Sequence, residues 1–152
     1  LNKMETGIFA AGCFWKPDLE FEELKGVEKT EVGYCGGNNP DTTYENVCTG
    51  STNHAEVVKV YYDKNIISYE KLVEFFLKIH NPTTLNRQGP DIGTQYRSEI
   101  FYTTETQKKI AEKILDQKNN DFNGKIVTKV SKVLNYCKAE DYHQKYLKKK
   151  GM

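Results

Sequence analysis

The sequence lacks the features that point to a nucleic-acid partner or a membrane. Its 22 Lys and Arg residues are balanced by 21 Asp and Glu residues, so a net charge of +1 gives little attraction for a polyanion. No apolar run reaches the roughly 18 residues that span a bilayer. The basic cluster Lys148-Lys149-Lys150 is better explained as solvated surface. Because the start also lacks signal-peptide character, we expect a soluble, cytoplasmic protein.

Cysteine is scarce, and the cysteines lack the close spacing that zinc sites and CxxC redox motifs require. They are Cys13, Cys35, Cys48 and Cys137. We therefore expect no bound metal and, in a reducing compartment, no structural disulfide. The simplest interpretation of any one of them is a small buried apolar side chain.

Cys13 differs from the other cysteines because of its neighbours. It follows a predicted strand, Thr6–Ala11, and precedes a predicted helix that starts near Pro17. The unpaired N–H groups at a helix N-terminus favour a thiolate over a thiol, so we expect a reactive Cys13 with a low pKa. Phe14 and Trp15 are unusual at a surface turn unless they line a pocket. The sequence therefore makes Cys13 a candidate nucleophile.

Hydrophobic periodicity, capping residues and turn residues predict the order of the secondary-structure elements. The predicted strands are Thr6–Ala11, Val27–Tyr34, Ala55–Asp63, Arg97–Thr103 and Lys125–Leu134, and the predicted helices are Pro17–Lys25, Tyr69–His80, Thr104–Asn119 and Ala139–Lys149. Two long polar segments, 38–53 and 81–96, are expected to be irregular, with one helical turn at Tyr44–Cys48. This order predicts a single catalytic domain over residues 1–152. Its class is α+β, a two-layer α/β sandwich whose mixed or antiparallel sheet has a ferredoxin-like β-α-β core.

Glu56 lies near the start of a strand whose two faces are both apolar. It shares one face with Val58 and Val60, whereas Val57 belongs to the other. A carboxyl at the entrance of such a strand is partly desolvated, which raises its pKa. A protonated carboxyl can donate a proton to a developing oxyanion. The alternative is an ordinary strand-end carboxylate that reaches solvent.

The two long polar segments carry side chains suited to binding. Tyr44 and Tyr96 can donate hydrogen bonds through their hydroxyls, and Asp91 can accept one from an amide N–H. The three histidines are far apart in the sequence. Cys13 and His143 could form a Cys-His pair of an acyl transferase or hydrolase, although a structural hydrogen bond is the simpler role for each histidine. A non-enzymatic thiol sensor or binding module is a further alternative.

Seven short blocks of the chain together carry a family resemblance. They are Gly12-Cys13-Phe14-Trp15; Gly33-Tyr34 with Gly36-Gly37; Tyr44-Glu45-Asn46-Val47-Cys48-Thr49-Gly50; His54-Ala55-Glu56-Val57-Val58; Ile67-Ser68-Tyr69-Glu70; Asn86-Arg87-Gln88-Gly89 with Asp91 and Gly93-Thr94-Gln95-Tyr96-Arg97-Ser98; and Ala139-Glu140-Asp141-Tyr142-His143-Gln144-Lys145-Tyr146-Leu147. In this order they resemble the methionine-S-sulfoxide reductase A family (peptide-methionine (S)-S-oxide reductase). The resemblance extends over almost the whole chain.

The resemblance implies an oxidoreductase that reduces methionine (S)-sulfoxide to methionine. In the family's pattern, Cys13 attacks the sulfoxide sulfur and is left as a sulfenic acid, the first and reversible stage of cysteine oxidation. Glu56 protonates the sulfoxide oxygen, and Tyr44 and Tyr96 hydrogen-bond that oxygen.

The resemblance also implies a set of substrate-binding residues. Phe14 and Trp15, with a contribution from Tyr96, form an apolar wall for the substrate methyl group. Asp91 and His143 contact the substrate backbone. The implied substrates are free methionine sulfoxide and oxidised proteins or peptides, so the implied role is protein repair under oxidative stress by a monomeric enzyme.

The resemblance implies no bound cofactor and an external thiol reductant, either thioredoxin or glutathione with glutaredoxin. Many relatives carry resolving cysteines in a glycine-rich C-terminal tail, whereas the last cysteine here is Cys137. Cys48 matches a position that is often cysteine in the family without being the resolver. Cys35 and Cys137 could resolve Cys13 or could simply pack. We expect a one-cysteine type of enzyme, whose sulfenic acid the external thiol reduces directly.

A second departure lies next to the nucleophile. Lys16-Pro17 follows Trp15, where many relatives have glycine. This change affects the rim of the expected site and leaves Cys13 in place.

Overall fold

The computed structural model describes residues 4–152. Residues 1–3 belong to the start of the chain, on which the cytoplasmic expectation rests, and lie outside the described residues. The strands are β1 (Met4–Ala11), β2 (Val27–Cys35), β3 (Ala55–Asp63), β4 (Arg87–Gln88), β5 (Asp91–Ile92), β6 (Ser98–Tyr102), β7 (Lys129–Lys132) and β8 (Cys137–Lys138). The helices are α1 (Trp15–Glu22), α2 (Tyr44–Cys48), α3 (Tyr69–Lys78), α4 (Glu105–Lys118) and α5 (Tyr146–Lys149), with 3₁₀ turns η1 (Thr94–Tyr96), η2 (Asn119–Phe122) and η3 (Asp141–His143). No helix in this part of the chain could cross a bilayer.

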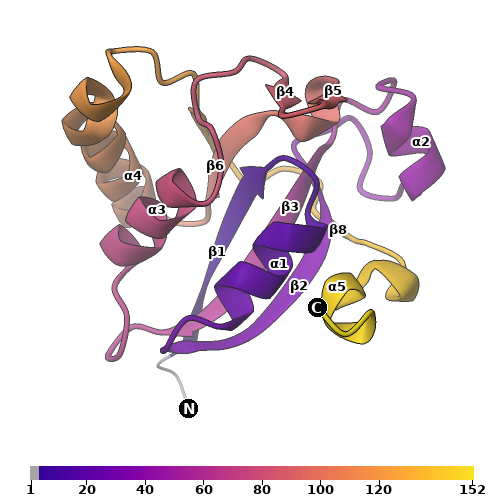
Figure 1. Cartoon of the computed structure of the whole chain (residues 1–152), viewed down its shortest axis with the longest axis horizontal. Helices are drawn as coiled ribbons and strands as arrows, with labels where there is room; N and C mark the ends of the chain where they lie inside the picture. The colour runs from indigo at the N-terminus through magenta and orange to yellow at the C-terminus, as the bar shows by residue number, and fades with distance from the viewer. Residues whose placement is uncertain (1–3) are drawn as a thin grey trace.

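Within residues 4–152, six strands form one mixed sheet in the order β7-β6-β1-β3-β2-β8 (Figure 1). All neighbours are antiparallel except β6 and β7. Because β3 lies between β1 and β2, the β1-α1-β2 unit is split by an antiparallel strand, as in ferredoxin-like folds. The predicted α+β class, mixed sheet and ferredoxin-like core are confirmed.

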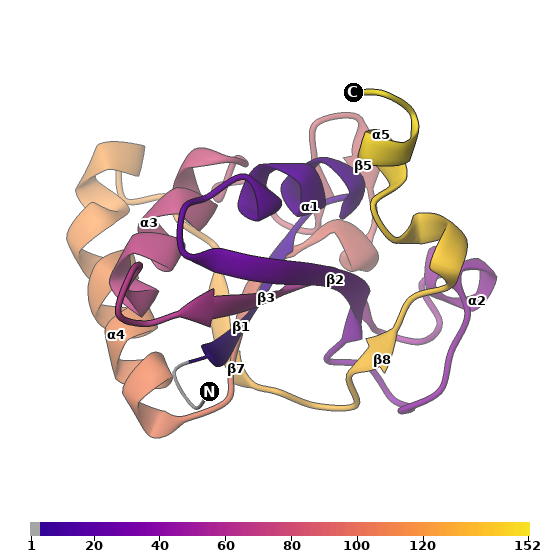
Figure 2. The same cartoon turned by 90° about the horizontal axis from the view of Figure 1, so that it is seen from below.

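The two faces of the sheet have different coverings, as the alternation of β3 predicts. Val58 and Val60 belong to the larger core, which also contains buried side chains of α1, α3 and α4. Val57 belongs to a smaller core on the other face, covered in part by Val133 and Tyr136. Figures 1 and 2 show α1, α3 and α4 on one side of the sheet. The fold is therefore the predicted two-layer sandwich, and Glu56 lies on its helical side, level with Tyr34 of β2.

The helical turn at Tyr44–Cys48 is confirmed as α2. Its N-cap is Thr43, whose hydroxyl accepts a hydrogen bond from the backbone N–H of Asn46 at 3.2 Å. Segment 81–96, predicted to lack regular structure, instead contains the small hairpin β4-β5. Gly89 permits this hairpin because its φ of +59° suits a tight turn.

The predicted strand 125–134 is wrong at its N-terminal end, because only Lys129–Lys132 pairs with the sheet. The backbone N–H of Val127 bonds to the carbonyl of Pro82 at 2.8 Å, so this part of the segment is tied to a loop. Strand β8 was not predicted, since two residues are too short to show alternation.

The predicted helix Ala139–Lys149 is also wrong, because it is two short turns, η3 and α5, rather than one helix. Lys145 breaks it with a left-handed backbone at φ +56°. This conformation is held by tertiary contacts: the backbone N–H of Lys145 donates to Asp18 at 3.1 Å, and its ammonium pairs with Glu22 at 2.7 Å. Local periodicity could not reveal these long-range partners.

We predict that Phe9→Ala lowers the free energy of unfolding by about 3–5 kcal/mol, because it leaves a cavity in the core. Phe9 is fully buried, and its ring lies 5.2 Å from Phe21 and 5.5 Å from Phe76. Urea unfolding measures the change. Leu85→Ala is the control, since Leu85 is 66% exposed and should change stability by less than about 0.5 kcal/mol. Equal effects of the two variants would contradict this description of the core.

Candidate active site

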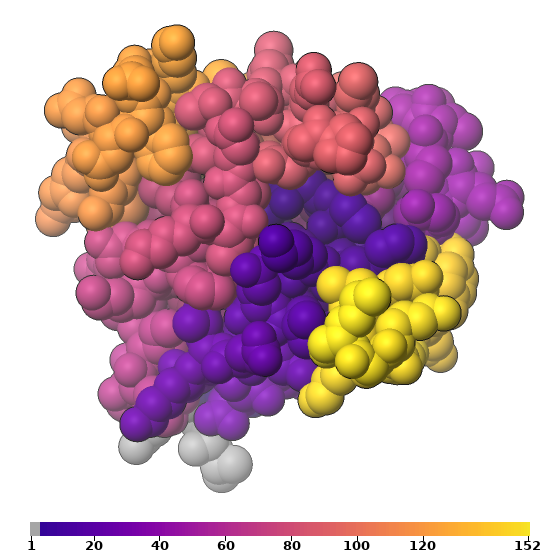
Figure 3. Space-filling model, viewed as in Figure 1, coloured from indigo at the N-terminus to yellow at the C-terminus, as the bar shows by residue number. Residues whose placement is uncertain are grey.

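The turn between β1 and α1 directs Cys13 toward the end of the sheet. Gly12 has a φ of +86°, and a Cβ atom built there would lie 2.7 Å from the side chain of Gln88. Only glycine therefore fits both the backbone conformation and the close approach of the β4 strand. In Figure 3 the indigo surface of this region is recessed between the rose β4-β5 hairpin, the purple α2 and the yellow C-terminal segment.

Glu56 is joined to this turn by a hydrogen bond. The backbone N–H of Phe14 donates to Glu56 Oε1 at 3.1 Å, and the Glu56 side chain is 1% exposed. Among the described residues, Glu56 Oε2 has no hydrogen-bond partner. Burial raises the pKa of Glu56 to about 8, against the lowering effect of the Phe14 N–H. Near neutral pH the carboxyl is therefore mostly protonated, and its proton lies on Oε2 because Oε1 is an acceptor.

The expected thiolate at Cys13 is wrong for the protein without substrate. Burial, and next the negative charge of Glu56, raise the pKa of Cys13 to about 12, although the backbone N–H of Trp15 lowers it. The field of one helix terminus is too weak to offset the loss of solvent around the sulfur. The resting site therefore carries two protons, one on the Cys13 thiol and one on Glu56.

Tyr44 and Tyr96 come from different elements but face the same space. Both are half-buried, Tyr44 on α2 and Tyr96 at the end of η1. Burial and then the charge of Glu56 raise the pKa of Tyr96 to about 12. Burial, then Cys48 and Glu56, raise the pKa of Tyr44. Both phenols therefore stay protonated at neutral pH and can donate hydrogen bonds beside Glu56.

Asp91 also belongs to this group of side chains. It lies in β5, half-buried, and its charge contributes after burial to the raised pKa values of Glu56 and Cys13. The hairpin β4-β5 thus brings Asp91 to the end of the sheet where Cys13 lies.

His143 lies behind Trp15 rather than beside Cys13. Its Nδ1 accepts a hydrogen bond from Trp15 Nε1 at 3.0 Å, and its side chain is 1% exposed. Burial lowers the pKa of His143, so the ring is neutral and its proton is on Nε2. In residues 4–152 Nε2 has no partner, and no hydrogen bond joins His143 to Cys13. The imidazole therefore orients the indole, and a Cys13–His143 pair is not formed.

The two aromatic residues after Cys13 have different environments. Phe14 is 1% exposed, and its ring lies 5.8 Å from Tyr34 and 5.2 Å from His143. Trp15 is half-buried and stacks on Tyr146, with ring centroids 3.9 Å apart. Phe14 thus anchors the turn in the core, while Trp15 presents an apolar surface next to Cys13.

Two supporting residues in the site were given no role by the sequence, namely Tyr34 and Glu140. Glu140 accepts a hydrogen bond from the Tyr34 hydroxyl at 2.8 Å and one from the backbone N–H of Tyr44 at 2.9 Å. Burial alone would raise the pKa of Glu140, but these hydrogen bonds lower it, so it is a carboxylate. Figure 2 shows the yellow C-terminal segment passing α2 toward α1. The density of polar and aromatic residues in segment 139–147 was the available signal.

All four cysteines are free thiols. Cys35 is fully buried in the smaller core, on the face of the sheet opposite Glu56, and its thiol donates to the carbonyl of Leu134 at 3.4 Å. Cys137 lies in β8 across from Tyr34, and Cys48 is exposed at the end of α2.

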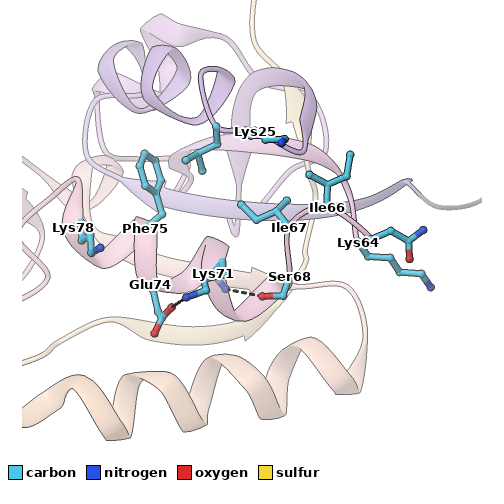
Figure 4. A pocket seen from close by; sticks show the side chains of 11 residues that line it. Lys25, Lys64, Ile66, Ile67, Ser68, Lys71, Glu74, Phe75 and Lys78 are labelled. Carbon is cyan, nitrogen blue, oxygen red and sulfur yellow. Dashed lines mark hydrogen bonds and ion pairs between the residues drawn. The ribbon is translucent and has the colours of Figure 1, made fainter.

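A cleft of about 710 Å³ lies away from this site, between the end of α1 and the start of α3 (Figure 4). Leu24, Ile66, Ile67 and Phe75 form its apolar part, and several lysines line its rim, including Lys71, which pairs with Glu74. Among its lining residues there is no Cys, His or Tyr. The cleft therefore lacks a thiol, an imidazole and a phenol, and the candidate site is identified instead by the reactive groups around Cys13.

A half-buried thiol beside a protonated carboxyl and two phenols, on a split β-α-β fold, defines a cysteine-dependent enzyme that supplies protons to an oxygen atom. Asp91 of β5 is near enough to contribute to the raised pKa values of Cys13 and Glu56. This arrangement resembles neither a Cys-His hydrolase nor a metal site, and no cluster of three metal-binding side chains occurs in residues 4–152.

Comparisons with known proteins identify the family. The model of a family described as peptide methionine sulfoxide reductase matches residues 5–152. The peptide methionine sulfoxide reductase MsrA of Pelagibacter ubique is 58% identical over 147 residues, covering 97% of this chain and all of the relative. Reduced Mxr1 from Saccharomyces cerevisiae has a TM-score of 0.94 at 36% identity, covering 99% of this chain and 87% of that chain. Mxr1 in complex with Trx2 has the same fold, with a TM-score of 0.69 at 24% identity and coverage of 95% and 85%. The chain belongs to the peptide methionine sulfoxide reductase family.

We predict that Glu56→Gln removes a pH dependence of stability. The pKa of Glu56 rises from 4.5 to about 8 on folding, so between these values the folded protein holds one more proton than the unfolded chain. The free energy of unfolding of the wild type should therefore fall, relative to that of Glu56→Gln, by up to about 1.4 kcal/mol per pH unit. Urea unfolding from about pH 5 to about pH 8 measures the difference. If the free energies of unfolding of the wild type and of Glu56→Gln change in parallel with pH, the Glu56 carboxyl is ionised over the whole range and the prediction is wrong.

Proposed function

We propose that Cys13 and Glu56 together carry out the reduction of methionine (S)-sulfoxide in this protein. The family's activity is thiol-dependent reduction of methionine sulfoxide and repair of oxidised proteins, and the acyl transferase or hydrolase alternative has no support. The observation that carries the proposal is the protonated, unpartnered Oε2 of Glu56 at the same turn as the Cys13 thiol.

The two protons of the resting site match the needs of the reaction. A sulfoxide oxygen is a poor leaving group until it is protonated, and Glu56 Oε2 holds a proton for it. As the Cys13 sulfur attacks the sulfoxide sulfur, its own proton is released and restores the Glu56 carboxyl. The oxygen is transferred to Cys13, so methionine and a Cys13 sulfenic acid are the products and the atoms balance. Tyr44 and Tyr96 stabilise the oxygen by hydrogen bonds while its charge develops.

Substrate binding is assigned to the surfaces around Cys13. We assign the apolar wall for the S-methyl group to Trp15 and Phe14, with a contribution from Tyr96. Asp91 accepts a hydrogen bond from a backbone N–H of the substrate. His143 acts through Trp15 by fixing the plane of the indole, and its Nε2, which has no partner among the described residues, is buried.

The sulfenic acid of Cys13 requires an external thiol to restore the enzyme. We propose thioredoxin as this reductant, with glutathione and glutaredoxin as the second candidate. The relative Mxr1 has been crystallised in complex with Trx2, which supports the first choice. The four free thiols are in keeping with a reducing compartment such as the cytoplasm.

We predict that Glu56→Gln slows formation of methionine about 10²–10⁴-fold in a single turnover, because an amide cannot transfer the proton. Gln keeps the acceptor for the Phe14 N–H, so the fold is retained. Cys13→Ser should form no methionine. Rapid-quench chromatography of methionine gives the rates. Glu112→Gln on the exposed face of α4 is the matched control and should behave as wild type. An undiminished rate for Glu56→Gln would exclude Glu56 as the acid.

We predict reduction of the S but not the R diastereomer of a methionine sulfoxide peptide. An oxygen bound by Glu56 and a methyl group held by Trp15 fix two of the substituents of the sulfur, so only one configuration presents its sulfur to Cys13. Separation of the two diastereomers by chromatography after incubation with a dithiol gives the result. Consumption of the R form, or of neither, would overturn the assignment.

A further inference from the structure

The Cys13 sulfenic acid, if the proposed function is right, can be resolved by a thiol of the same chain or only by an external one. The sequence holds three other cysteines, and their positions differ sharply. Cys35 is excluded, because it is buried on the opposite face of the sheet. Cys137 lies on the right face but on the edge strand β8. Tyr34 pairs with Cys137 on one side and with Glu56 on the other, so its ring separates them.

Cys48 is on the same side of α2 as Tyr44. The two residues are four positions apart, so their side chains are neighbours on one face of the helix. The Tyr44 ring lies 4.5 Å from the ring of His143, which in turn lies 5.2 Å from the ring of Phe14, so this face of α2 is directed toward the turn that carries Cys13. Gln95, which precedes Tyr96, donates from its amide to the Cys48 carbonyl at 3.5 Å. Cys48 therefore lies one helical turn after Tyr44, and its backbone is linked to the segment that carries Tyr96.

The electrostatics agree with this placement. Burial and Glu56 have the larger effects, but a charge on Cys48 also raises the pKa of Cys13 and of Tyr96. Neither Cys35 nor Cys137 is among the main causes of the raised pKa of Cys13. Cys48 is also exposed, so an external reductant can reach it more easily than it can reach Cys13, which is half-buried.

We propose that Cys48 resolves Cys13, forming a Cys13–Cys48 disulfide. The Cys48 sulfur attacks the sulfenic sulfur of Cys13, an S–S bond forms and the S–O bond breaks. The departing oxygen takes the proton of the Cys48 thiol together with its own hydrogen and leaves as water. Cys48 is oxidised and Cys13 is reduced by the same step. An external dithiol then supplies two electrons and two protons, attacking the exposed Cys48 sulfur.

The backbone around Cys48 allows the approach that this bond requires. A disulfide needs Cα atoms within about 7 Å. Helix α2 is five residues long, and irregular segments flank it on both sides. After it, Gly50 has a φ of +79° with nothing within 4 Å of a Cβ built there. The formation of the bond therefore requires movement at the C-terminal end of α2, next to Gly50, while the buried Val47 and the Tyr44–Glu140 hydrogen bond hold the start of the helix.

The test is a thiol count after one turnover. Fully reduced protein is mixed with excess methionine sulfoxide without reductant, free thiols are titrated, and tryptic peptides are mapped without reduction. We expect two thiols lost per chain and a peptide that joins Cys13 to Cys48. In Cys48→Ser one thiol is lost, and dimedone traps Cys13 as the sulfenic acid. Cys35→Ser and Cys137→Ser are the matched controls and should behave as wild type.

Loss of one thiol in the wild type, or a cross-link from Cys13 to Cys35 or Cys137, would overturn the inference. Stoichiometric hydrogen peroxide, which also converts a reactive cysteine into a sulfenic acid, tests the pairing without the sulfoxide. A Cys13–Cys48 cross-link with peroxide but no methionine from the sulfoxide would reject the proposed function and uphold the pairing. If the wild type forms methionine and dimedone traps its Cys13 sulfenic acid, the proposed function is upheld and the Cys13–Cys48 pairing is rejected.

Discussion

The hydrogen bond from the Phe14 backbone to Glu56 is the contact on which the site depends. It joins the β1-α1 turn, which carries Cys13, to β3, which carries the carboxyl. It also occupies one carboxyl oxygen as an acceptor, so the proton of the neutral acid is left on the other. Strands β1 and β3 are already paired in the sheet, and this bond fixes the turn after β1 relative to the carboxyl.

Burial then decides the protonation of both groups. The same loss of solvent raises the pKa of Glu56 and of Cys13, and each negative charge would oppose the other. A neutral pair is consequently the stable resting state.

The C-terminal segment holds the rest of the pocket in place from outside the sheet. Glu140 links Tyr34 to the start of α2, and His143 and Tyr146 fix the indole of Trp15. The hydrogen bond to His143 and the stacking of Tyr146 thus orient the indole of Trp15. The carboxylate of Glu140 secures the helix that carries Tyr44 and Cys48.

The sequence by itself determined the fold class, the Tyr44–Cys48 turn and the two faces of β3, because strict alternation and capping residues are local signals. It also indicated Cys13 and Glu56, since a strand end before a helix and a carboxyl in an apolar strand are visible in one dimension. Tertiary structure alone decided the protonation of Cys13, because desolvation depends on surrounding atoms. Tertiary contacts also break the C-terminal helix at Lys145 and place His143 behind Trp15. They put Cys35 on the face of the sheet opposite Glu56 and tie the helix that carries Tyr44 and Cys48 to Glu140. Each of these outcomes rests on contacts between residues far apart in the chain, which no local pattern records.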